Sequence, residues 1–497
     1  MSHYDYIIIG AGSAGCVLAN RLSENANYSV LLLEAGPSDK RFFVQMPIGY
    51  GKTFYQSKVN WMYTSNANAG LNGRTSYWPR GKTLGGSSSI NAMVYVRGHK
   101  QDFNDWQSAG NPGWSYDHVL PYFKRMESWQ HGADEYRGGS GPLNVSDVSA
   151  NLHPLCKHFV AAGEALGFKY NADMNGTKQE GVGYYQLTTH QGQRMSAARA
   201  YLKPARKRSN LTVMCNTAVT RILFEGKRAI GVEYQHKHKN YRANATKEVI
   251  LSAGAVNSPQ LLQLSGIGPS HVLQKAGVEQ VHESPAVGQH LQDHISHSYF
   301  YRASQPTLNQ QLQPWWGKLW QGIRYVLTRS GPLSLSINQA GGFVHTREGL
   351  DRPNIQLYFS PLSYTKAPLG ERPMMNPDPF PAYVLGISNC RVRSEGEINI
   401  TSSDPSKAPA IEPNYLTHED EIQDLLEGVK LIRKLAETSQ LQAITLDEMR
   451  PGLGCKTDAQ LIEDIRNNAD TVFHPCGTCR MGPDPKDNVV NNELKVH

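Results

Sequence analysis

The sequence lacks the features that mark a membrane-spanning or nucleic-acid-binding protein. No run of 18 apolar residues occurs among its 497 residues, so we expect no helix that spans a bilayer. No run of five or more lysines and arginines occurs either, and the 50 basic residues are interleaved with 43 acidic ones for a net charge of +7. A charge so modest and mixed argues against nucleic acid as a partner.

Cysteine is scarce, with seven scattered residues, and an odd set of this kind disfavours a disulfide framework and favours a reducing compartment. The first residues, MSHYDY, are polar and do not resemble a signal peptide. A chain of this length exceeds one compact core, so two or more domains are expected. These observations predict a soluble, cytoplasmic, multidomain protein.

The most informative stretch joins a buried strand, a glycine-rich turn, a helix and a second buried strand. The apolar run 6–9 leads into Gly10-x-Gly12-x-x-Gly15, and the run 30–33 ends at Glu34. In this arrangement the glycines allow a tight turn, the approach of a pyrophosphate and close helix packing, while the acid binds a ribose. We expect a dinucleotide, FAD or NAD, to contact Gly10, Gly12, Ser13, Ala14, Gly15, Glu34 and Ala35.

Two further glycine-rich segments are expected to close around the same ligand. In residues 78–98, Gly81-Lys82-Thr83 hints at a phosphate-binding P-loop, but Ser76 stands where that motif needs glycine. Small residues then follow at 85–89, where main chain can lie against a flat ligand, before a strand-like run at 93–96. Residues 248–268 predict a buried strand, a small-residue turn and a helix that ends near Gly266.

Together the three segments resemble the glucose–methanol–choline (GMC) oxidoreductase family of FAD-dependent alcohol dehydrogenases and oxidases. The stretches RMSAARAYLKPA (194–205), VGQHLQDH (287–294) and APAIEPNYL (408–416) are similar to further landmarks of that family. Segment 78–99 most resembles bacterial quinone-linked aliphatic alcohol dehydrogenases, which are often grouped with choline dehydrogenases. The likeness covers essentially the whole chain.

The resemblance implies an α/β fold in which an FAD-binding Rossmann-like domain carries an inserted α+β substrate-binding domain built on an antiparallel sheet. We assign residues 1–294 mainly to the FAD domain, 295–450 mainly to the substrate domain, and 451–497 to a return to the FAD domain. The FAD would be noncovalent, because Ile90 stands where some family oxidases carry a flavin-linked histidine. The resemblance further places FAD against Gly85, Gly86, Ser87, Asn91, Ala92, Met93, Val94, Val219 and Ala253.

TVFHPCGTCRMG, residues 471–482, carries the candidate catalytic residue, His474. The segment resembles the family's catalytic histidine motif. A zinc or thiol redox site formed with Cys476 and Cys479 is the competing interpretation. Zinc lacks a fourth ligand nearby, and proline and glycine interrupt the cysteine pair, so we expect no metal here.

An alcohol has a pKa of about 15.7 if it is as weak an acid as water, and histidine has one of about 6.5. Full proton transfer to His474 before hydride departure would cost about 12 kcal/mol. We therefore expect proton transfer to accompany hydride transfer, or the alkoxide to be stabilised electrostatically.

Two departures from the family pattern affect the expected activity. The chain stops at NNELKVH, before the family's second catalytic group, so we expect the 497-residue form to be impaired. A truncated, inactive flavin-binding protein is the alternative of another class. Gln339 stands where choline-acting members carry a glutamate in the substrate pocket. Without that carboxylate, only cation–π contacts of about 0.5–2 kcal/mol would hold a quaternary amine. Gln339 therefore favours an uncharged alcohol over choline.

The segment 314–331 has helical periodicity with three tryptophans. It predicts either a lid or core helix packed on the substrate domain, or an amphipathic segment that contacts the inner membrane, where a quinone acceptor would be found. Residues 416–438 predict a further helix, and three runs between 354 and 403 predict strands.

Overall fold

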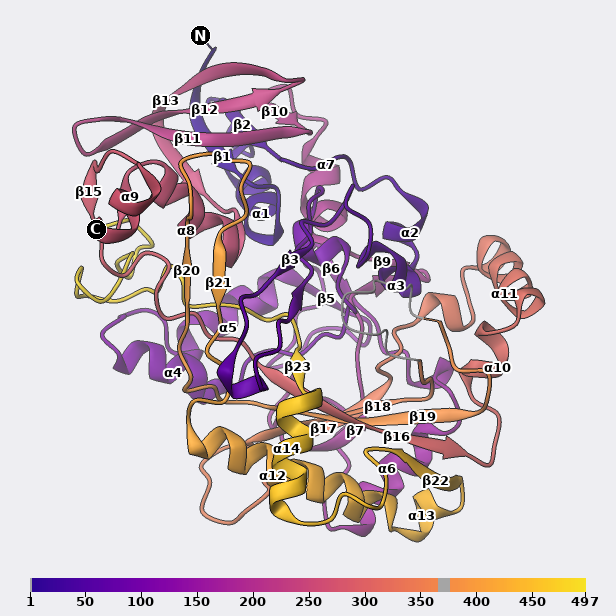
Figure 1. The fold of residues 1–497 in the computed structure, drawn as a ribbon. Helices are drawn as coiled ribbons and strands as arrows, with labels where there is room; N and C mark the ends of the chain where they lie inside the picture. The colour runs from indigo at the N-terminus through magenta and orange to yellow at the C-terminus, as the bar shows by residue number, and fades with distance from the viewer. Residues whose placement is uncertain (1, 365–375) are drawn as a thin grey trace.

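A computed structural model describes residues 2–364 and 376–497, and its strands form two large sheets at opposite ends of the molecule (Figure 1). The first sheet has six strands in the order β10-β2-β1-β13-β12-β11. Their bounds are β1 Ser2–Ile9, β2 Val30–Leu33, β10 Leu211–Met214, β11 Thr217–Glu225, β12 Arg228–His236 and β13 Lys239–Leu251.

Four of these strands, β10, β2, β1 and β13, run parallel, and β12 and β11 continue the sheet as an antiparallel meander. The apolar ends of β1 and β2 are buried on both faces, as parallel strands require. The strands predicted at 6–9 and 30–33 are thus confirmed, and the one predicted at 249–251 is the end of the longer β13. Helices α1 (Ser13–Leu22) and α8 (Gly254–Leu264) follow β1 and β13, and so begin at the carboxyl edge of the sheet, where α/β folds bind nucleotides.

The second sheet is antiparallel, in the order β22-β16-β19-β18-β17-β7, with a short strand β23 (Asp470–Thr471) beside β16. Its strands are β7 Gly181–Tyr184, β16 Ile295–Ala303, β17 Ala340–Val344, β18 Ile355–Ser360, β19 Ala382–Asn389 and β22 Thr445–Arg450. The antiparallel sheet predicted for this region is confirmed. Because β7 comes from the N-terminal half of the chain, the division at residue 294 describes only where most strands of each sheet lie, and it stays a prediction.

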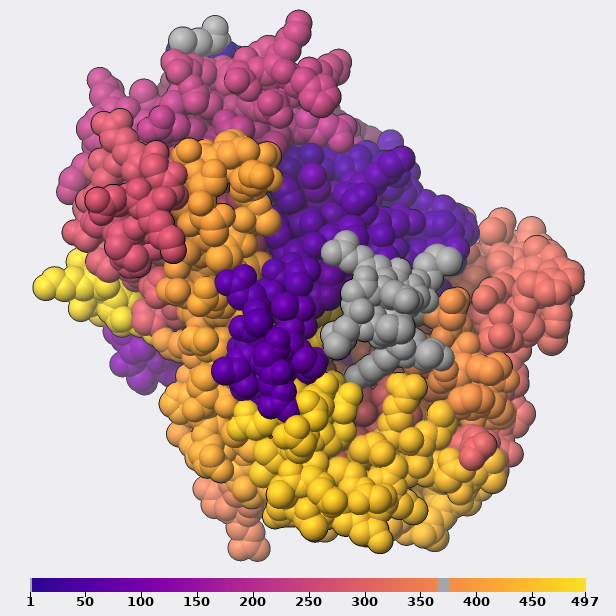
Figure 2. All heavy atoms as spheres, in the orientation of Figure 1, coloured from indigo at the N-terminus to yellow at the C-terminus, as the bar shows by residue number. Residues whose placement is uncertain are grey.

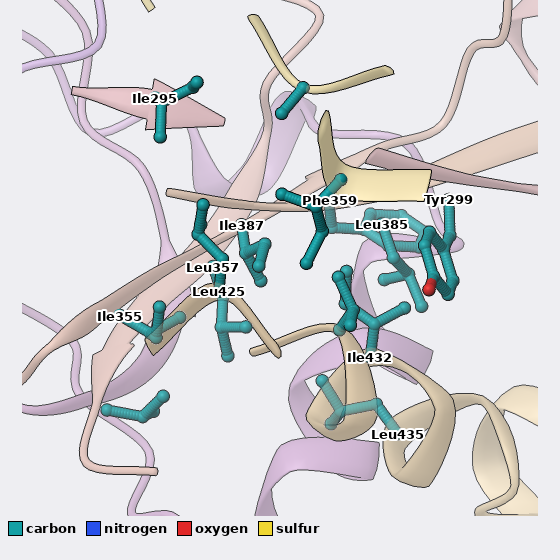
Figure 3. Packing of buried hydrophobic residues seen from close by; sticks show 14 of the residues in the cluster. Ile295, Tyr299, Ile355, Leu357, Phe359, Leu385, Ile387, Leu425, Ile432 and Leu435 are labelled. Atoms are coloured by element: carbon teal, nitrogen blue, oxygen red, sulfur yellow. The ribbon is translucent and has the colours of Figure 1, made fainter. Parts of the chain in front are cut away.

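Helices cover one face of the second sheet and complete its core (Figure 1). They are α6 Cys156–Ala165, α12 Glu419–Ala436, α13 Ser439–Gln442 and α14 Asp458–Asn468. The predicted helix within 416–438 is confirmed as α12. Figure 3 shows its apolar side chains directed at those of the strands, among them Leu425, Ile432, Leu435, Ile355, Leu357 and Leu385.

Two strand predictions were wrong in part. The run at 396–403 forms β20 (Glu397–Asn399), but it pairs with β21 (Ala410–Glu412) in a separate two-stranded sheet. It lies there because the Ile398 amide donates to the Gly288 carbonyl at 2.7 Å, outside the second sheet. The run at 93–96 makes only an isolated bridge, from Val94 to Leu187, because Met93 adopts a left-handed backbone (φ 64°) that interrupts an extended chain.

The remaining longer helices are α4 Lys100–Ser108, α5 Tyr116–Met126, α9 Ser270–Ala276, α10 Leu308–Leu312 and α11 Trp315–Thr328. The helix predicted in 314–331 is therefore present as α11, at the edge of the molecule (Figure 1). Across the described residues, no helix has both the length and the apolar character needed to cross a membrane.

Candidate active site

A cavity of about 1540 Å³ opens beside the carboxyl edge of the parallel strands. Drug-sized ligands occupy about 300–1,000 Å³, so this space suits a larger molecule such as a dinucleotide. Ten predicted cofactor residues line it: Gly10, Gly12, Ser13, Ala14, Glu34, Ala35, Gly86, Ser87, Val219 and Ala253. The other six, Gly15, Gly85, Asn91, Ala92, Met93 and Val94, do not line it.

The N-terminus of α1 faces this cavity without a side-chain cap. Its cap residue is Gly12, no side chain accepts from the first turn, and that turn contains no acid. The first N–H groups of a helix need a partner, and together with the helix dipole they favour a phosphate. The start of α8, capped by Ala253, likewise receives no side-chain hydrogen bond. The cavity therefore offers what a pyrophosphate requires.

The glycines of the first turn differ in the space around them. A Cβ on Gly15 would lie 1.9 Å from the Gly10 carbonyl oxygen, whereas one on Gly12 would meet nothing closer than 3.8 Å. A Cβ on Gly86 would lie 2.8 Å from the Gly12 Cα, so the second glycine segment packs directly on the first. Gly15 is thus required for packing within the protein, and Gly12 borders the open cavity.

We expect Gly12→Ala and Gly15→Ala to separate these roles. Gly15→Ala should lower the free energy of unfolding of the apoprotein by about 1–3 kcal/mol, because its methyl group overlaps backbone. Gly12→Ala should change that value by less than about 1 kcal/mol. It should weaken FAD binding about tenfold or more, since its methyl group enters the phosphate site. Chemical denaturation and flavin-fluorescence titration measure the two quantities, and equal loss of fold stability in both variants would contradict the assignment.

Glu34 is buried at the end of β2 and lines the cavity. Its two carboxylate oxygens accept from the backbone amides of Ala11 (2.9 Å) and Gly36 (2.8 Å), which leaves lone pairs for ribose hydroxyls. Burial raises the pKa of Glu34 to about 7, against these hydrogen bonds and the nearby charge of Lys82. The carboxyl is therefore positioned as the fingerprint predicts.

His474 lies in a turn that a buried carboxylate, Asp293, fixes from beneath. One Asp293 oxygen accepts from the His474 amide at 2.7 Å. The other accepts from the hydroxyls of Tyr415, at 2.6 Å, and Thr471. The Thr471 hydroxyl oxygen in turn accepts from the Phe473 amide at 2.7 Å. Asp293 therefore organises the whole turn.

Arg80 connects this turn to the cavity. It lines the cavity, and its guanidinium donates to the Phe473 carbonyl at 2.6 Å. Phe473 has a left-handed backbone (φ 68°), which is strained for a bulky residue and needs such support. Burial lowers the pKa of Arg80 to about 10, while the charge of Asp293 opposes that shift. Asp293 and Arg80 thus hold the turn from opposite sides.

His474 is exposed to solvent, although many protein atoms lie around its ring. Burial, together with the charges of His294 and Arg80, lowers the pKa of His474 to about 4. The rings of His294 and His474 lie edge to face with centroids 5.8 Å apart. At neutral pH the imidazole of His474 is therefore uncharged and can accept a proton.

The neighbouring cysteines show no sign of thiol or metal chemistry. Burial raises the pKa of the Cys479 thiol to about 12, the opposite of the shift that activates a thiolate. Burial also raises the pKa of Cys476, whose backbone pairs with Gln292. Within the described ranges, all cysteines are free and no three His, Cys, Asp or Glu side chains are grouped so as to hold a metal. The zinc and thiol alternatives thus receive no support.

Two predicted residues are engaged away from the cavity. Gln339 is buried, and its side-chain oxygen accepts from the His153 amide at 2.8 Å while its amide donates to the Ser336 carbonyl. Asn91 is exposed, and its oxygen accepts from the buried Arg194 at 2.7 Å. The structure therefore does not bring Gln339 to the cavity.

Sequence reasoning missed Asp293, His294 and Arg80 as residues of the His474 turn and its surroundings. Each lies within a stretch that resembles a family landmark, so the signal was present, but their roles depend on contacts between distant parts of the chain. The motifs indicated that these segments take part in the site, but they did not indicate which side chains contact one another.

Comparisons with known proteins identify the family of the chain. The family described as GMC oxidoreductase matches residues 4–296 in its N-terminal part and 392–497 in its C-terminal part. The chain is 43% identical to an oxygen-dependent choline dehydrogenase of Vibrio vulnificus, over 99% of this chain and 87% of the relative. It is 41% identical to an alcohol dehydrogenase [acceptor] of Pseudomonas putida, over 99% and 89% of the two chains.

Solved structures show the same fold. Pyridoxine 4-oxidase from Mesorbium loti superposes with a TM-score of 0.88 at 31% identity, covering 99% of this chain and 92% of that one. Formate oxidase of Aspergillus oryzae gives a TM-score of 0.89 at 25% identity, covering 100% and 92%. The glycine-lined dinucleotide cavity, the uncapped helix N-terminus and these matches together show that the chain belongs to the GMC family of FAD-binding oxidoreductases.

Proposed function

We propose that this enzyme oxidises a primary, aliphatic alcohol to the aldehyde, with His474 as base and hydrogen-bond partner of the hydroxyl. The supporting observation is the turn that carries a neutral imidazole at His474, anchored by Asp293 and joined to the cofactor cavity through Arg80. FAD, when bound, supplies a hydride acceptor at N5 of its flavin, and the electrons pass to a quinone or another acceptor. Electron transfer to a quinone would suit a protein that lies in the cytoplasm against the inner membrane.

His474 has two tasks in this reaction. Asp293 fixes its backbone, and its ring lies edge to face with that of His294, which limits where the hydroxyl can bind. Its lowered pKa keeps the base form populated but makes it a weaker base than ordinary histidine. The difference between the pKa of His474 and that of an alcohol is therefore larger than for an ordinary histidine. The hydroxyl proton must then move to His474 as the hydride leaves the carbinol carbon.

Choline is the second candidate substrate, because curated relatives include choline dehydrogenases from Vibrio vulnificus and human mitochondria. An uncharged alcohol is favoured by the state of Asp293, the carboxylate that anchors the His474 turn. Both oxygens of that carboxylate already accept hydrogen bonds, and burial raises its pKa to about 6. It offers no free anionic partner for a trimethylammonium.

The test is anaerobic addition of a panel of aliphatic alcohols and choline to the purified holoenzyme, with flavin absorbance as readout. Bleaching by aliphatic alcohols with a higher second-order rate constant than choline supports the proposal. Faster bleaching by choline would assign the substrate to choline instead, and bleaching by none would favour an inactive flavin-binding protein. Subsequent addition of dioxygen or a quinone analogue identifies the acceptor. The expectation that this form is impaired has no support in the comparisons.

We expect FAD to be released when the protein is denatured. Ile90, at the position of the covalent histidine in some family oxidases, is buried and has no nucleophile. Acid precipitation should leave essentially all yellow flavin in the supernatant. Flavin fluorescence that migrates with the polypeptide on a denaturing gel would contradict noncovalent binding.

The pH dependence of kcat/KM should reflect the unusual environment of His474. Because its pKa is lowered to about 4, the neutral, proton-accepting form persists when the pH falls from 8 to 5. We therefore expect kcat/KM to stay nearly flat over that range, whereas an ordinary histidine would lose half its base form at about pH 6.5. A loss centred near 6.5 that persists in Asp293→Asn would contradict this interpretation.

A further inference from the structure

Helix α11 presents its large apolar side chains to solvent. Leu327 is 77% exposed, Trp315 75%, Trp320 63% and Trp316 61%. Three more apolar residues of the same helix are also exposed: Leu319, Ile323 and Val326. Figure 2 shows the segment standing out from the rest of the surface at one edge of the molecule. A cluster of seven exposed apolar side chains on one solvent-facing helix marks an interaction site.

The orientation of α11 is the reverse of that expected for a helix packed on its own protein. Its buried residues are Gly317, Gln321 and Tyr325, which recur every four residues and form one narrow stripe. At 3.6 residues per turn, the seven exposed apolar residues fall within an arc of about 140° on the opposite side. A Cβ on Gly317 would lie 2.5 Å from the Gln311 carbonyl oxygen, so the small residues form the packed side. A lid or core helix packed through its tryptophans is therefore not what the structure contains.

Charges around the apolar arc have one sign. Lys318, Arg324 and Arg329 are the only Asp, Glu, Lys or Arg residues between positions 303 and 346. Lys318 and Arg324 fall on the two flanks of the arc at helical spacing, and both are exposed. An apolar face with tryptophans, flanked by cations, is the arrangement of helices that lie in the interface of an anionic membrane.

A neighbouring element lies at the packed side of α11. Phe42, the first residue of α2 (Phe42–Gln45), contacts Tyr325 of the buried stripe edge to face, with ring centroids 6.2 Å apart. Lys40 and Arg41 precede it and are exposed. The contact fixes the buried side of α11 to the rest of the protein, so the apolar arc on the other side remains outward.

We propose that α11 forms a docking surface that binds the protein peripherally to membranes containing anionic lipid. The apolar arc enters the boundary between headgroups and acyl chains, and Lys318 and Arg324 remain at the level of the phosphates. The helix lies parallel to the membrane plane, because its apolar residues line its length and not one end.

Flotation of the holoenzyme with vesicles tests this surface. Wild type should partition onto phosphatidylcholine–phosphatidylglycerol vesicles, and less onto phosphatidylcholine alone. Trp316→Ser/Trp320→Ser/Leu327→Ser should lower the partition coefficient by at least about tenfold. Lys318→Gln/Arg324→Gln should remove most of the preference for anionic lipid. Leu446→Ser/Leu453→Ser, at residues 62% and 66% exposed elsewhere on the surface, is the matched control and should bind as wild type.

Turnover with a water-soluble electron acceptor should be unchanged in the triple variant, which shows that the fold and active site are intact. Failure of the wild type to bind any vesicle, or equal binding by the triple variant, would overturn the proposal. Light scattering distinguishes a second copy as the occupant. A wild-type dimer that the triple variant converts to a monomer, without vesicle binding by either, would also refute membrane docking.

Discussion

Replacing His474 with alanine is expected to lower kcat by about 10²–10⁴-fold while FAD stays bound. The imidazole is the neutral group that receives the hydroxyl proton, and its loss leaves no base at that point of the turn. Its side chain does not line the FAD cavity, so flavin content should match wild type. Anaerobic stopped-flow reduction of the flavin by alcohol measures the rate of the affected step.

Cys476→Ser is the matched control within the same turn. Its thiol is protonated at neutral pH because burial raises its pKa, so we expect turnover within about twofold of wild type. The opposite result, in which the cysteine variant is inactive and the histidine variant is active, would revive a thiol mechanism for this segment.

Asp293→Ala is expected to lower kcat by about 10–100-fold without a comparable change in the KM for alcohol, because the turn that carries His474 loses its anchor. The substitution leaves the His474 amide and the hydroxyls of Tyr415 and Thr471 without their acceptor. Unsatisfied buried donors of this kind should lower the free energy of unfolding by about 1–3 kcal/mol. Asp293 is thus a positioning residue.

Asp293→Asn separates positioning from general loss of structure. The amide oxygen can still accept from the His474 backbone, so we expect most of kcat to return. Burial raises the pKa of Asp293 from 3.8 to about 6, so the folded protein binds this proton more tightly than the unfolded chain. The free energy of unfolding should therefore fall as the pH rises from about 4 to 6, and this contribution should disappear in Asp293→Asn. Equal kcat for Asn and Ala variants would contradict the positioning role.

Local patterns predicted the cofactor half of the molecule well. The fingerprint at residues 6–34 fixes a strand, a turn and a helix through short-range sterics, and six of the seven ligand contacts predicted from it line the cavity. The antiparallel second sheet followed from the family resemblance. Conformations such as the left-handed backbone of Met93 depend on tertiary contacts, so an apolar run there was mistaken for a strand.

The substrate half was less predictable because the direction of a side chain depends on packing partners far away in sequence. Gln339 was expected in a substrate pocket by analogy, and its side-chain oxygen accepts from the His153 amide, just before α6. Asp293 contacts a residue 181 positions away. The periodicity of the sequence predicted the helix α11, but it did not indicate which side of that helix faces solvent.

The register between β23 and β16 has a consequence for how substrate preference can change. Thr471 pairs with Ile295, the first residue of β16, and His474 follows three positions later, above Asp293. The proposed proton acceptor is thereby held by the first residues of a strand in the second sheet. A substitution that leaves β16, β23 and Asp293 in place should leave His474 where it is. Substrate preference can therefore change while the reacting hydroxyl keeps its partner.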